Sequence, residues 1–552
     1  MKRFPNPLFR LLSAAAGVLL FAAPSGRAAV DTVTTTADSG PGSLRNSIAA
    51  SGSGDTIVFS PALAGDTVYL TSGELLIGQN LTIDASALVK GIMISGSGNF
   101  RVLEIGSGAS VILDGLTVTN GYATDELGGD GALLDDATSS LTASACAFCG
   151  NTSESGGAIC ANGPLMLNDC IVSGNSATVF GGGIFADGGL VTLNHCTIAR
   201  NSVSSGGGGG IENEFGALIL NNCVFSNNVA SIFGGGIDSE NGSSLAATNC
   251  TLTGNLSGTA GALSTQSPSI LDNCAFSNNI STNSAGGGIA NYDTLTLNHC
   301  AFSGNIVSNK GQGGALLNSG ILTMNNCTLS GNSAANGNGA GIYVEPVTTN
   351  TIINCTICSN SAAGGIGGGI YINAPGIVAL TNTIVAGNAA ATGTDVSGSY
   401  LGAANFIGGN PELAALGNYG GPTLTMPPLF GSAVIDAGTD WVTNFLATDQ
   451  RGFPRRAGAH VDIGAVEAQF AAPKNRPVLS PSWVPVGGNG SFRFTFTNAA
   501  NADFTVFAST NLASPLAEWS VLGNATQYFP EQFQFTDTPA TIHARFYEVI
   551  SP

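Results

Sequence analysis

The stretch "CIVSGNSATVFGGGIFADGGLVTLNHC", residues 170–196, decides the fold of this chain. It contains short runs rich in Val, Ile, Leu, Phe and Thr, and Gly, Asn, Ser and Asp separate them. Such runs are typical of short strands joined by tight turns. Since no segment shows a long helical period, the pattern predicts β-structure throughout.

This unit recurs about every 26 residues through the middle of the chain, and three marks keep the same phase. An aliphatic residue ends each Gly-rich stretch, at Leu133, Ile159, Ile184, Ile211, Ile237, Leu263, Ile289, Leu316, Ile342 and Ile370. Cysteines recur at Cys146, Cys170, Cys196, Cys223, Cys250, Cys274, Cys300, Cys327 and Cys355. Asparagines follow them at Asn151, Asn175, Asn201, Asn228, Asn255, Asn279, Asn305, Asn332 and Asn360. Three marks in fixed phase indicate a stacked repeat protein.

A strand this short cannot bury itself, but stacking it on its copy in the next coil completes its hydrogen bonds. We therefore predict an all-β fold, a right-handed parallel β-helix of three-sided coils followed by a small C-terminal β-sandwich. The cysteine column should point inward, where small apolar side chains pack closely. The asparagines should lie at a turn with left-handed backbone geometry, and the glycines at the opposite corner.

Changes in composition divide the chain into five parts. Residues 1–29 have a basic start, an apolar stretch and small residues, as in a signal peptide. Residues 30–400 form the predicted β-helix, and "GPGSLRNSIAAS" near its start predicts a short helix that caps the first coil, with Leu44 and Ile48 on one side. A closing segment at 401–467, a Pro-rich linker at 468–482 and an alternating β-sandwich pattern at 483–552 follow.

The formal net charge of −19 argues against nucleic acid or anionic lipid as a partner and suits an exported protein. Twelve cysteines in an exported chain allow disulfides, but nine of them lie in one regular column, which favours packed thiols. Both states stay open from the sequence. Cys160 lies one residue after Ile159 and is expected to be exposed.

Several segments resemble known families. The repeats with "GGAI", "GGAL" or "GGGI" and a Phe-x-x-Asn segment, as at Phe148 to Asn151, resemble those of chlamydial polymorphic outer-membrane proteins, which are β-helical surface adhesins. The opening "TADSGPGSLRNSI" is similar to a Cys-Ser-Leu-Arg-Glu-Ala segment of bacterial surface proteins, with Gly42 in place of the cysteine. "GNYGGPTLTM" and "TDQRGFPRRAGAHVDIGAVE" look like the choice-of-anchor Q domain of secreted bacterial proteins. The tail is similar to C-terminal modules of exported verrucomicrobial proteins. These resemblances imply a surface location and no catalytic residue.

Five carboxylates form the candidate site. Glu212 and Asp238 each lie one residue after the aliphatic mark, and Asp187, Glu214 and Glu240 lie three after it. Both offsets point outward, so the five should share one face of adjacent coils. Stacked like charges are costly unless a cation relieves them, and Ca²⁺ prefers such oxygen ligands. The alternative is a solvated acidic face.

Paired carboxylates also serve glycosidases, so a polysaccharide lyase or glycoside hydrolase is the enzyme hypothesis. Against it, the only Lys or Arg residues between Arg101 and Arg451 are Arg200 and Lys310, and a lyase needs a basic group. His195 and His299 are expected to be ordinary outward positions that cannot share a ligand. Near the end of the closing segment, basic and acidic residues are expected to form ion pairs that seal the last coil: Arg451, Arg455, Arg456, Asp436, Asp449, Asp462 and Glu467. A binding pocket among them is the alternative.

We therefore expect an exported surface or extracellular protein without catalytic residues, which binds a glycan or a cell-surface ligand as an adhesin does. No cofactor is expected apart from a Ca²⁺ ion at the five carboxylates.

Overall fold

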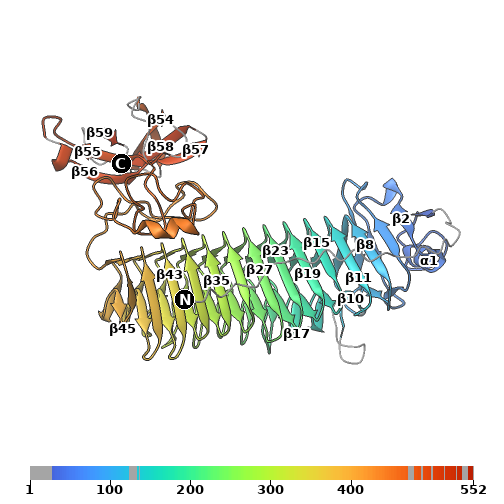
Figure 1. Ribbon diagram of the computed structural model, residues 1–552. Helices are drawn as coiled ribbons and strands as arrows, with labels where there is room; N and C mark the ends of the chain where they lie inside the picture. The colour runs from blue at the N-terminus through green and yellow to red at the C-terminus, as the bar shows by residue number, and fades with distance from the viewer. Residues whose placement is uncertain are drawn as a thin grey trace.

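The computed structural model describes residues 28–123, 133–135, 137–469, 478–486, 489–498, 502–514, 516–529, 531–537 and 545–550. Most of the chain winds into a right-handed parallel β-helix, and small antiparallel sheets follow at the C-terminus (Figure 1). The predicted fold class is confirmed. The predicted signal peptide lies almost wholly outside the described residues, as does most of the predicted linker.

One coil of the β-helix contains four strands. The chain passes through β19 (Leu190–Asn194), β20 (Thr197–Ala199) and β21 (Ser202–Val203), then a glycine-rich loop, and enters β22 (Ile211–Glu214). The prediction of a three-sided coil therefore missed one strand of each such coil. The missed strand, β21, is two residues long, and it pairs with the next coil before the glycine-rich loop begins.

Successive coils build four parallel sheets. Sheet 1 has 15 strands, from β1 (Val30–Val33) to β51 (Leu401–Ala403), and sheet 2 has 14, from β3 (Thr67–Tyr69) to β52 (Phe406–Ile407). Sheet 3 has 10 strands, from β13 (Thr152–Ser155) to β49 (Ala389–Thr392), and sheet 4 has 13, from β4 (Leu75–Ile77) to β50 (Val396–Ser397). In sheet 4 the aliphatic marks pair directly, because Ile184 faces Ile211 and Ile211 faces Ile237. The repeat is thus in register from coil to coil.

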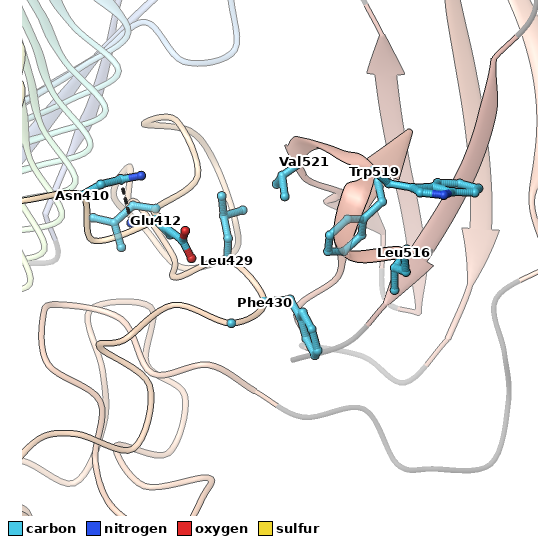
Figure 2. A pocket seen from close by; sticks show the side chains of 10 residues that line it. Asn410, Glu412, Leu429, Phe430, Leu516, Trp519 and Val521 are labelled. Atoms are coloured by element: carbon cyan, nitrogen blue, oxygen red, sulfur yellow. Dashed lines mark hydrogen bonds between the residues drawn. The ribbon is translucent and has the colours of Figure 1, made fainter. Parts of the chain in front are cut away.

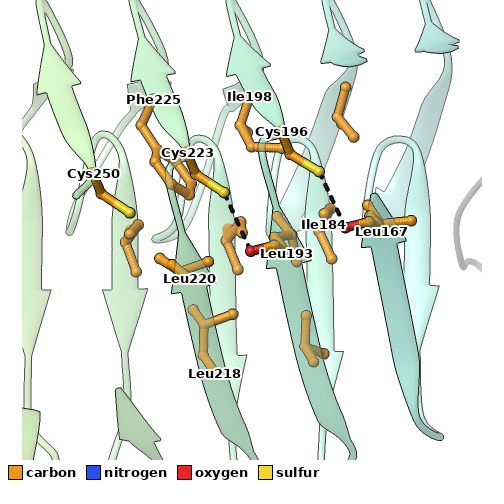
Figure 3. Packing of buried hydrophobic residues seen from close by; sticks show 14 of the residues in the cluster. Leu167, Ile184, Leu193, Cys196, Ile198, Leu218, Leu220, Cys223, Phe225 and Cys250 are labelled. Atoms are coloured by element: carbon orange, nitrogen blue, oxygen red, sulfur yellow. Dashed lines mark hydrogen bonds between the residues drawn. The ribbon is translucent and has the colours of Figure 1, made fainter. Parts of the chain in front are cut away.

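The cysteine column lies inside the β-helix, as predicted (Figure 3). None of the twelve cysteines forms a disulfide, so the disulfide alternative is not adopted. The Cys223 Sγ donates to the carbonyls of Asn221 at 3.3 Å and of Leu193 in the preceding coil at 3.4 Å. In the last coil Thr383 takes the cysteine position, and its hydroxyl donates to the Thr381 carbonyl at 3.0 Å. The column therefore combines apolar packing with a hydrogen bond at each step.

The asparagine marks form a buried ladder, here called the asparagine ladder (Asn151 to Asn388, one residue per coil). Both the backbone N–H and the side-chain amide of Asn201 donate to Asn228 Oδ1, at 3.0 and 3.1 Å. The predicted bond from copy to copy is confirmed, but the predicted left-handed backbone is wrong. Positive φ falls on the residues just before the ladder, as at Arg200 (55°) and Asn227 (55°), and on those before each cysteine. The turn thereby directs the asparagine inward.

The first coil is capped by α1 (Leu44–Ala50), as predicted. The Ser43 side chain accepts the Asn46 N–H, and Leu44 and Ile48 are buried against the first strands. Arg45 fixes the helix from outside, because it pairs with Asp38 at 2.7 Å and donates to the Gly73 carbonyl at 2.7 Å. The cap covers strand edges that would otherwise be open.

The closing segment (residues 401–467) lies mainly along the outer side of sheet 2, where Figure 1 shows it in orange above the β-helix. The Thr423 hydroxyl donates to the His299 carbonyl at 2.8 Å, and Gln450 Nε2 donates to the Cys300 carbonyl at 3.3 Å. Two coils further on, the Ala465 N–H donates to Thr356 Oγ1 at 3.0 Å. The prediction that its ion pairs seal the last coil is wrong, since the segment is attached to the side of several coils.

The C-terminal residues form two small antiparallel sheets, as predicted. One contains β53 (Ser480–Val486), β54 (Asn489–Thr497), β58 (Gln532–Asp537) and β57 (Thr526–Phe529). The other contains β56 (Ser520–Asn524), β55 (Thr505–Ser509) and β59 (Phe546–Ile550). An aromatic cluster that includes Phe496, Phe504 and Phe533 packs between them. The sandwich is joined to the closing segment by an Arg451–Asp503 ion pair at 2.8 Å.

Candidate functional site

The five predicted carboxylates do lie together, on the outer side of sheet 4. They belong to β18 (Ile184–Asp187), β22 and β26 (Ile237–Ser239), or follow directly after β26. Glu212 faces Asp238 across one strand pair, and Asp187 faces Glu214 across another. Glu240 donates its N–H to the Asn213 carbonyl at 3.0 Å, which continues the stack. The outward alternation predicted from the sequence therefore holds.

The alternative prediction, that the five carboxylates form a solvated acidic face, is wrong for Glu212 and Asp238. Glu212 is 1% exposed and Asp238 is 0% exposed, whereas Asp187, Glu214 and Glu240 are partly exposed. The cover is the run of glycines at 206–210. A Cβ atom at Gly207 would lie 2.2 Å from Asp238 Oδ2 and 2.8 Å from Glu212 Oε2, so glycine is required for this close approach. Cys160, which was expected to be exposed, is also buried, at 1% exposed.

Glu212, Asp238 and Glu240 form what we call the acidic cluster, since one carboxylate oxygen from each lies within 4.8 Å of the others. Glu212 Oε2 and both oxygens of Asp238 are buried without a hydrogen-bond partner. Buried oxygens of this kind are costly, so the cluster is an exception that calls for a physical reason. Asp187 lies outside the cluster, and Glu214 lies beside it.

Burial and repulsion between like charges raise the pKa of Glu212 and of Asp238. Burial, together with the charges of Asp238, Glu240 and Glu214, raises the pKa of Glu212 to about 10. Burial likewise raises the pKa of Asp238 to about 7. The nearby Ser264 hydroxyl opposes that shift in Asp238, although it makes no hydrogen bond of normal geometry with the carboxylate. No salt bridge reaches these carboxylates within the described part of the chain.

Arg451 and Arg455 of the closing segment form buried ion pairs, whereas Arg456 pairs with Asp440 at the surface, at 3.4 Å. Arg451 pairs with Asp449 at 2.9 Å, and both side chains are fully buried. Arg455 lies 3.6 Å from Glu467 and donates to the Asp462 carbonyl at 2.7 Å. The carboxylates of Asp462 and Glu467 accept backbone N–H groups, including those of Ala468 and Ala457. These contacts hold the closing segment together.

The two histidines are four coils apart, as expected. His195 is exposed, with a left-handed φ of 54°. His299 is half-buried and lies 2.9 Å from Asp272 through Nδ1. Since its carbonyl also accepts Thr423, His299 marks one edge of the surface under the closing segment.

A pocket of about 660 Å³ lies between the closing segment and the C-terminal sheets (Figure 2). Its apolar lining includes Phe430, Phe507 and Trp519, and Asn410 and Glu412 add polar groups at its edge. Phe430 and Phe507 meet edge to face with ring centroids 6.2 Å apart, and Phe430 is 45% exposed. The Trp519 indole N–H donates to the Ser514 carbonyl at 3.0 Å, which fixes the ring. Volume and lining are those of a small-ligand pocket.

Sequence reasoning missed the pocket, because its residues come from two segments about a hundred positions apart. It also missed two parts of the acidic site. Ser264 follows Leu263 at the offset that Glu212 and Asp238 have after their own aliphatic marks, so the column itself could have identified it. The five consecutive glycines at 206–210, against three in the neighbouring coils, were a second signal.

Comparison with known proteins agrees with this architecture. The family model described as the right-handed β-helix region matches residues 66–255 and 235–407, and the chain therefore belongs to this family. Among the described residues, no helix is long and apolar enough to cross a membrane.

Two solved structures are similar to the chain in fold. One is the crystal structure of pectate lyase Pel9A, with 14% identity, a TM-score of 0.26, and coverage of 80% of this chain and 96% of that one. The other is the enzymatically active domain of tailspike protein 4 of bacteriophage CBA120, with 10% identity, a TM-score of 0.26, and coverage of 90% and 62%. Likenesses at this level carry no argument about this chain. No curated protein matches the chain.

Proposed function

We propose that this protein is a non-catalytic extracellular or cell-surface β-helix protein that binds a glycan. The observation that carries the proposal is the cover over the acidic cluster. A glycosidase or lyase must present its carboxylates to a polymer, but Glu212 and Asp238 are 1% and 0% exposed beneath the glycine run. Sheet 4 is therefore closed over the Glu212 and Asp238 pair.

The surface location rests on the signal-like residues 1–29 and on the resemblance of the closing segment to the choice-of-anchor Q domain. The resemblance of the repeats to those of chlamydial adhesins supports the same location. Export is tested by cell fractionation of the full chain beside a variant that lacks residues 1–29. Equal retention of both inside the cell would contradict the proposal.

The pocket at the closing segment is the proposed glycan site. Aromatic rings pack against the apolar faces of sugar rings, while the Asn410 amide and the Glu412 carboxylate offer hydrogen-bonding groups for hydroxyls. Phe430 is the exposed ring and lies between the two units (Figure 2). A pocket of about 660 Å³ accommodates one or two sugar units.

The test is affinity electrophoresis or calorimetry of the protein with a panel of neutral and acidic polysaccharides. We expect a neutral polysaccharide to bind and Phe430→Ala to weaken binding about tenfold, the cost of losing one aromatic contact. Phe445→Ala is the matched control, because Phe445 is 51% exposed on the same segment and outside the pocket lining. Release of reducing ends or unsaturated sugars from any polymer would overturn the non-catalytic assignment.

A further inference from the structure

We propose that the acidic cluster binds one calcium ion that joins three coils of the β-helix, with the Ser264 hydroxyl as a further ligand. Glu212 comes from the first of these coils, Asp238 and Glu240 from the second, and Ser264 from the third. This site is separate from the proposed glycan pocket and does not depend on it.

The spacing of the carboxylates fits a calcium ion. Calcium binds oxygen ligands at about 2.3–2.6 Å, so two ligands of one ion are at most about 5 Å apart. One oxygen each from Glu212, Asp238 and Glu240 meets this limit, since these atoms all lie within 4.8 Å of one another. The ligands come from three carboxylates and a hydroxyl, which suits a hard cation rather than zinc or copper.

An independent observation comes from a residue that carries no charge. Ser264 is 0% exposed, it faces Asp238 across the strand pair, and its hydroxyl has no hydrogen-bond partner. Ser264 is in β30 (Leu263–Thr265), and the coils that follow place apolar groups such as Ala290 and Leu317 at the same offset. A buried hydroxyl beside buried carboxylate oxygens, all without partners, is the arrangement that a bound cation would satisfy.

The glycine run buries one side of the site, and another side stays open to solvent. Gly207 lies against Asp238 and Glu212 and leaves no space for a side chain. Glu240, in contrast, is partly exposed, so an ion and its remaining waters can reach the cluster from that side. Glu214, also partly exposed, adds negative charge beside this entrance. Calcium takes six to eight oxygen ligands in a flexible geometry, so water can complete its coordination here. Magnesium requires a nearly ideal octahedron, which suits this site less well.

The test is thermal unfolding and calorimetry of the full chain in chelator and in 1 mM Ca²⁺ or Mg²⁺, an excess over the expected Kd of about 10 µM. We expect Ca²⁺ to raise the Tm by a few degrees and to bind with a stoichiometry of one, and Mg²⁺ to act more weakly. The double variant Glu212→Gln/Asp238→Asn keeps the shape of the cluster and removes its charge. It should be at least as stable as the parent in chelator and should lose the response to Ca²⁺.

Two further variants distinguish Ca²⁺ binding at the acidic cluster from general effects of charge on stability. Asp169→Asn is the control, since Asp169 is exposed at a left-handed position where other coils carry asparagine, and it should keep the full Ca²⁺ response. Gly207→Ala should weaken the response by crowding the ligands. The proposal is overturned if the parent shows no Ca²⁺ binding, if the double variant retains it, or if Mg²⁺ binds as tightly as Ca²⁺.

Discussion

A single side chain of the asparagine ladder satisfies polar groups in three coils. Asn228 accepts the backbone and side-chain N–H groups of Asn201, and its own amide donates to the Ile198 carbonyl and to Asn255. The ladder ends at Asp395, whose carboxylate accepts both N–H groups of Asn388 at 3.0 Å. From one asparagine to the next, donation thus runs in one direction along the axis, and it stops at a group that can only accept.

We expect Asn228→Ala to lower the free energy of unfolding by about 3 kcal/mol or more, because it leaves several buried groups without partners at about 1–3 kcal/mol each. Urea unfolding measured by circular dichroism would show the loss. Asn227→Gly is the control, since Asn227 has a φ of 55° and glycine adopts this geometry freely. An unchanged midpoint in Asn228→Ala would contradict the role of the ladder.

Residue identities predicted the inward cysteines and the outward acids but not what covers them. Alternation along a strand tells which face a side chain takes, and it correctly placed Glu212 and Asp238 outside the core. It cannot tell whether a loop lies over that face. The glycine run that buries both residues comes from the same coil as Glu212 but precedes its strand, so the contact depends on the path of the loop.

At the scale of elements, the regular strands and the capping helix were predictable because each has a local signal. The Ser43 cap and the apolar pair Leu44 and Ile48 predict α1, and the repeat predicts sheets 1, 2 and 4. Sheet 3 was missed, since many of its strands are two residues long and too short to show alternation. The side on which the closing segment attaches was also missed, because its contacts link residues more than a hundred positions apart.

The attachment of α1 should depend on pH through Asp38. Burial alone would raise the pKa of Asp38, but hydrogen bonds from Ser72, Arg45 and Thr71 lower it to about 2. Since this folded-state pKa lies below the ordinary value of 3.8, the ionised carboxylate stabilises the fold above pH 3.8. That contribution is lost as the pH falls through about 2.

We therefore expect Asp38→Asn to cost about 2 kcal/mol at neutral pH, as for hydrogen bonds to a charged group. The difference between parent and variant should shrink as the pH falls from about 4 to about 2. Unfolding by urea at several pH values measures it, and Asp31→Asn, an exposed change in the same first coil, serves as the control. A difference that stays constant down to pH 2 would show that the charge of Asp38 is unimportant.

At the scale of the whole molecule, one buried ion pair joins the closing segment to the C-terminal sandwich. Arg451 is held between Asp449 and Asp503, and Asp503 also accepts the Gln469 N–H at 3.0 Å. Removing one partner of a buried pair costs about 3–5 kcal/mol, because the other charge is left uncompensated.

We expect Asp503→Ala to separate the sandwich from the closing segment while the β-helix keeps its own stability. Limited proteolysis should then cut the C-terminal sheets faster, and the main thermal transition should not move. Asp537→Ala is the comparison, since Asp537 pairs with Arg545 inside the sandwich and should weaken the sandwich without changing its attachment. A shift of the main transition in Asp503→Ala would show that the units unfold as one.

The sideways attachment of the closing segment also predicts where the β-helix tolerates a change of length. A copy of residues 263–288 inserted after 288 adds one coil before the first contact with the closing segment, at His299. A copy of residues 316–341 inserted after 341 moves Cys300 and Thr356 one coil further apart. Gln450 and Ala465 can then no longer reach both partners at once. We expect the first insertion to fold with a Tm near that of the parent and the second to lower it clearly. Equal Tm values would contradict this.

The chain can therefore change by duplication in one part and not in another. Unequal recombination between two of the repeated coils before His299 would lengthen or shorten the rod by whole units without disturbing the contacts of the closing segment. The same event beneath the closing segment would break a fit that spans several coils. Related proteins should accordingly vary in the number of their early coils and share a constant number of late ones.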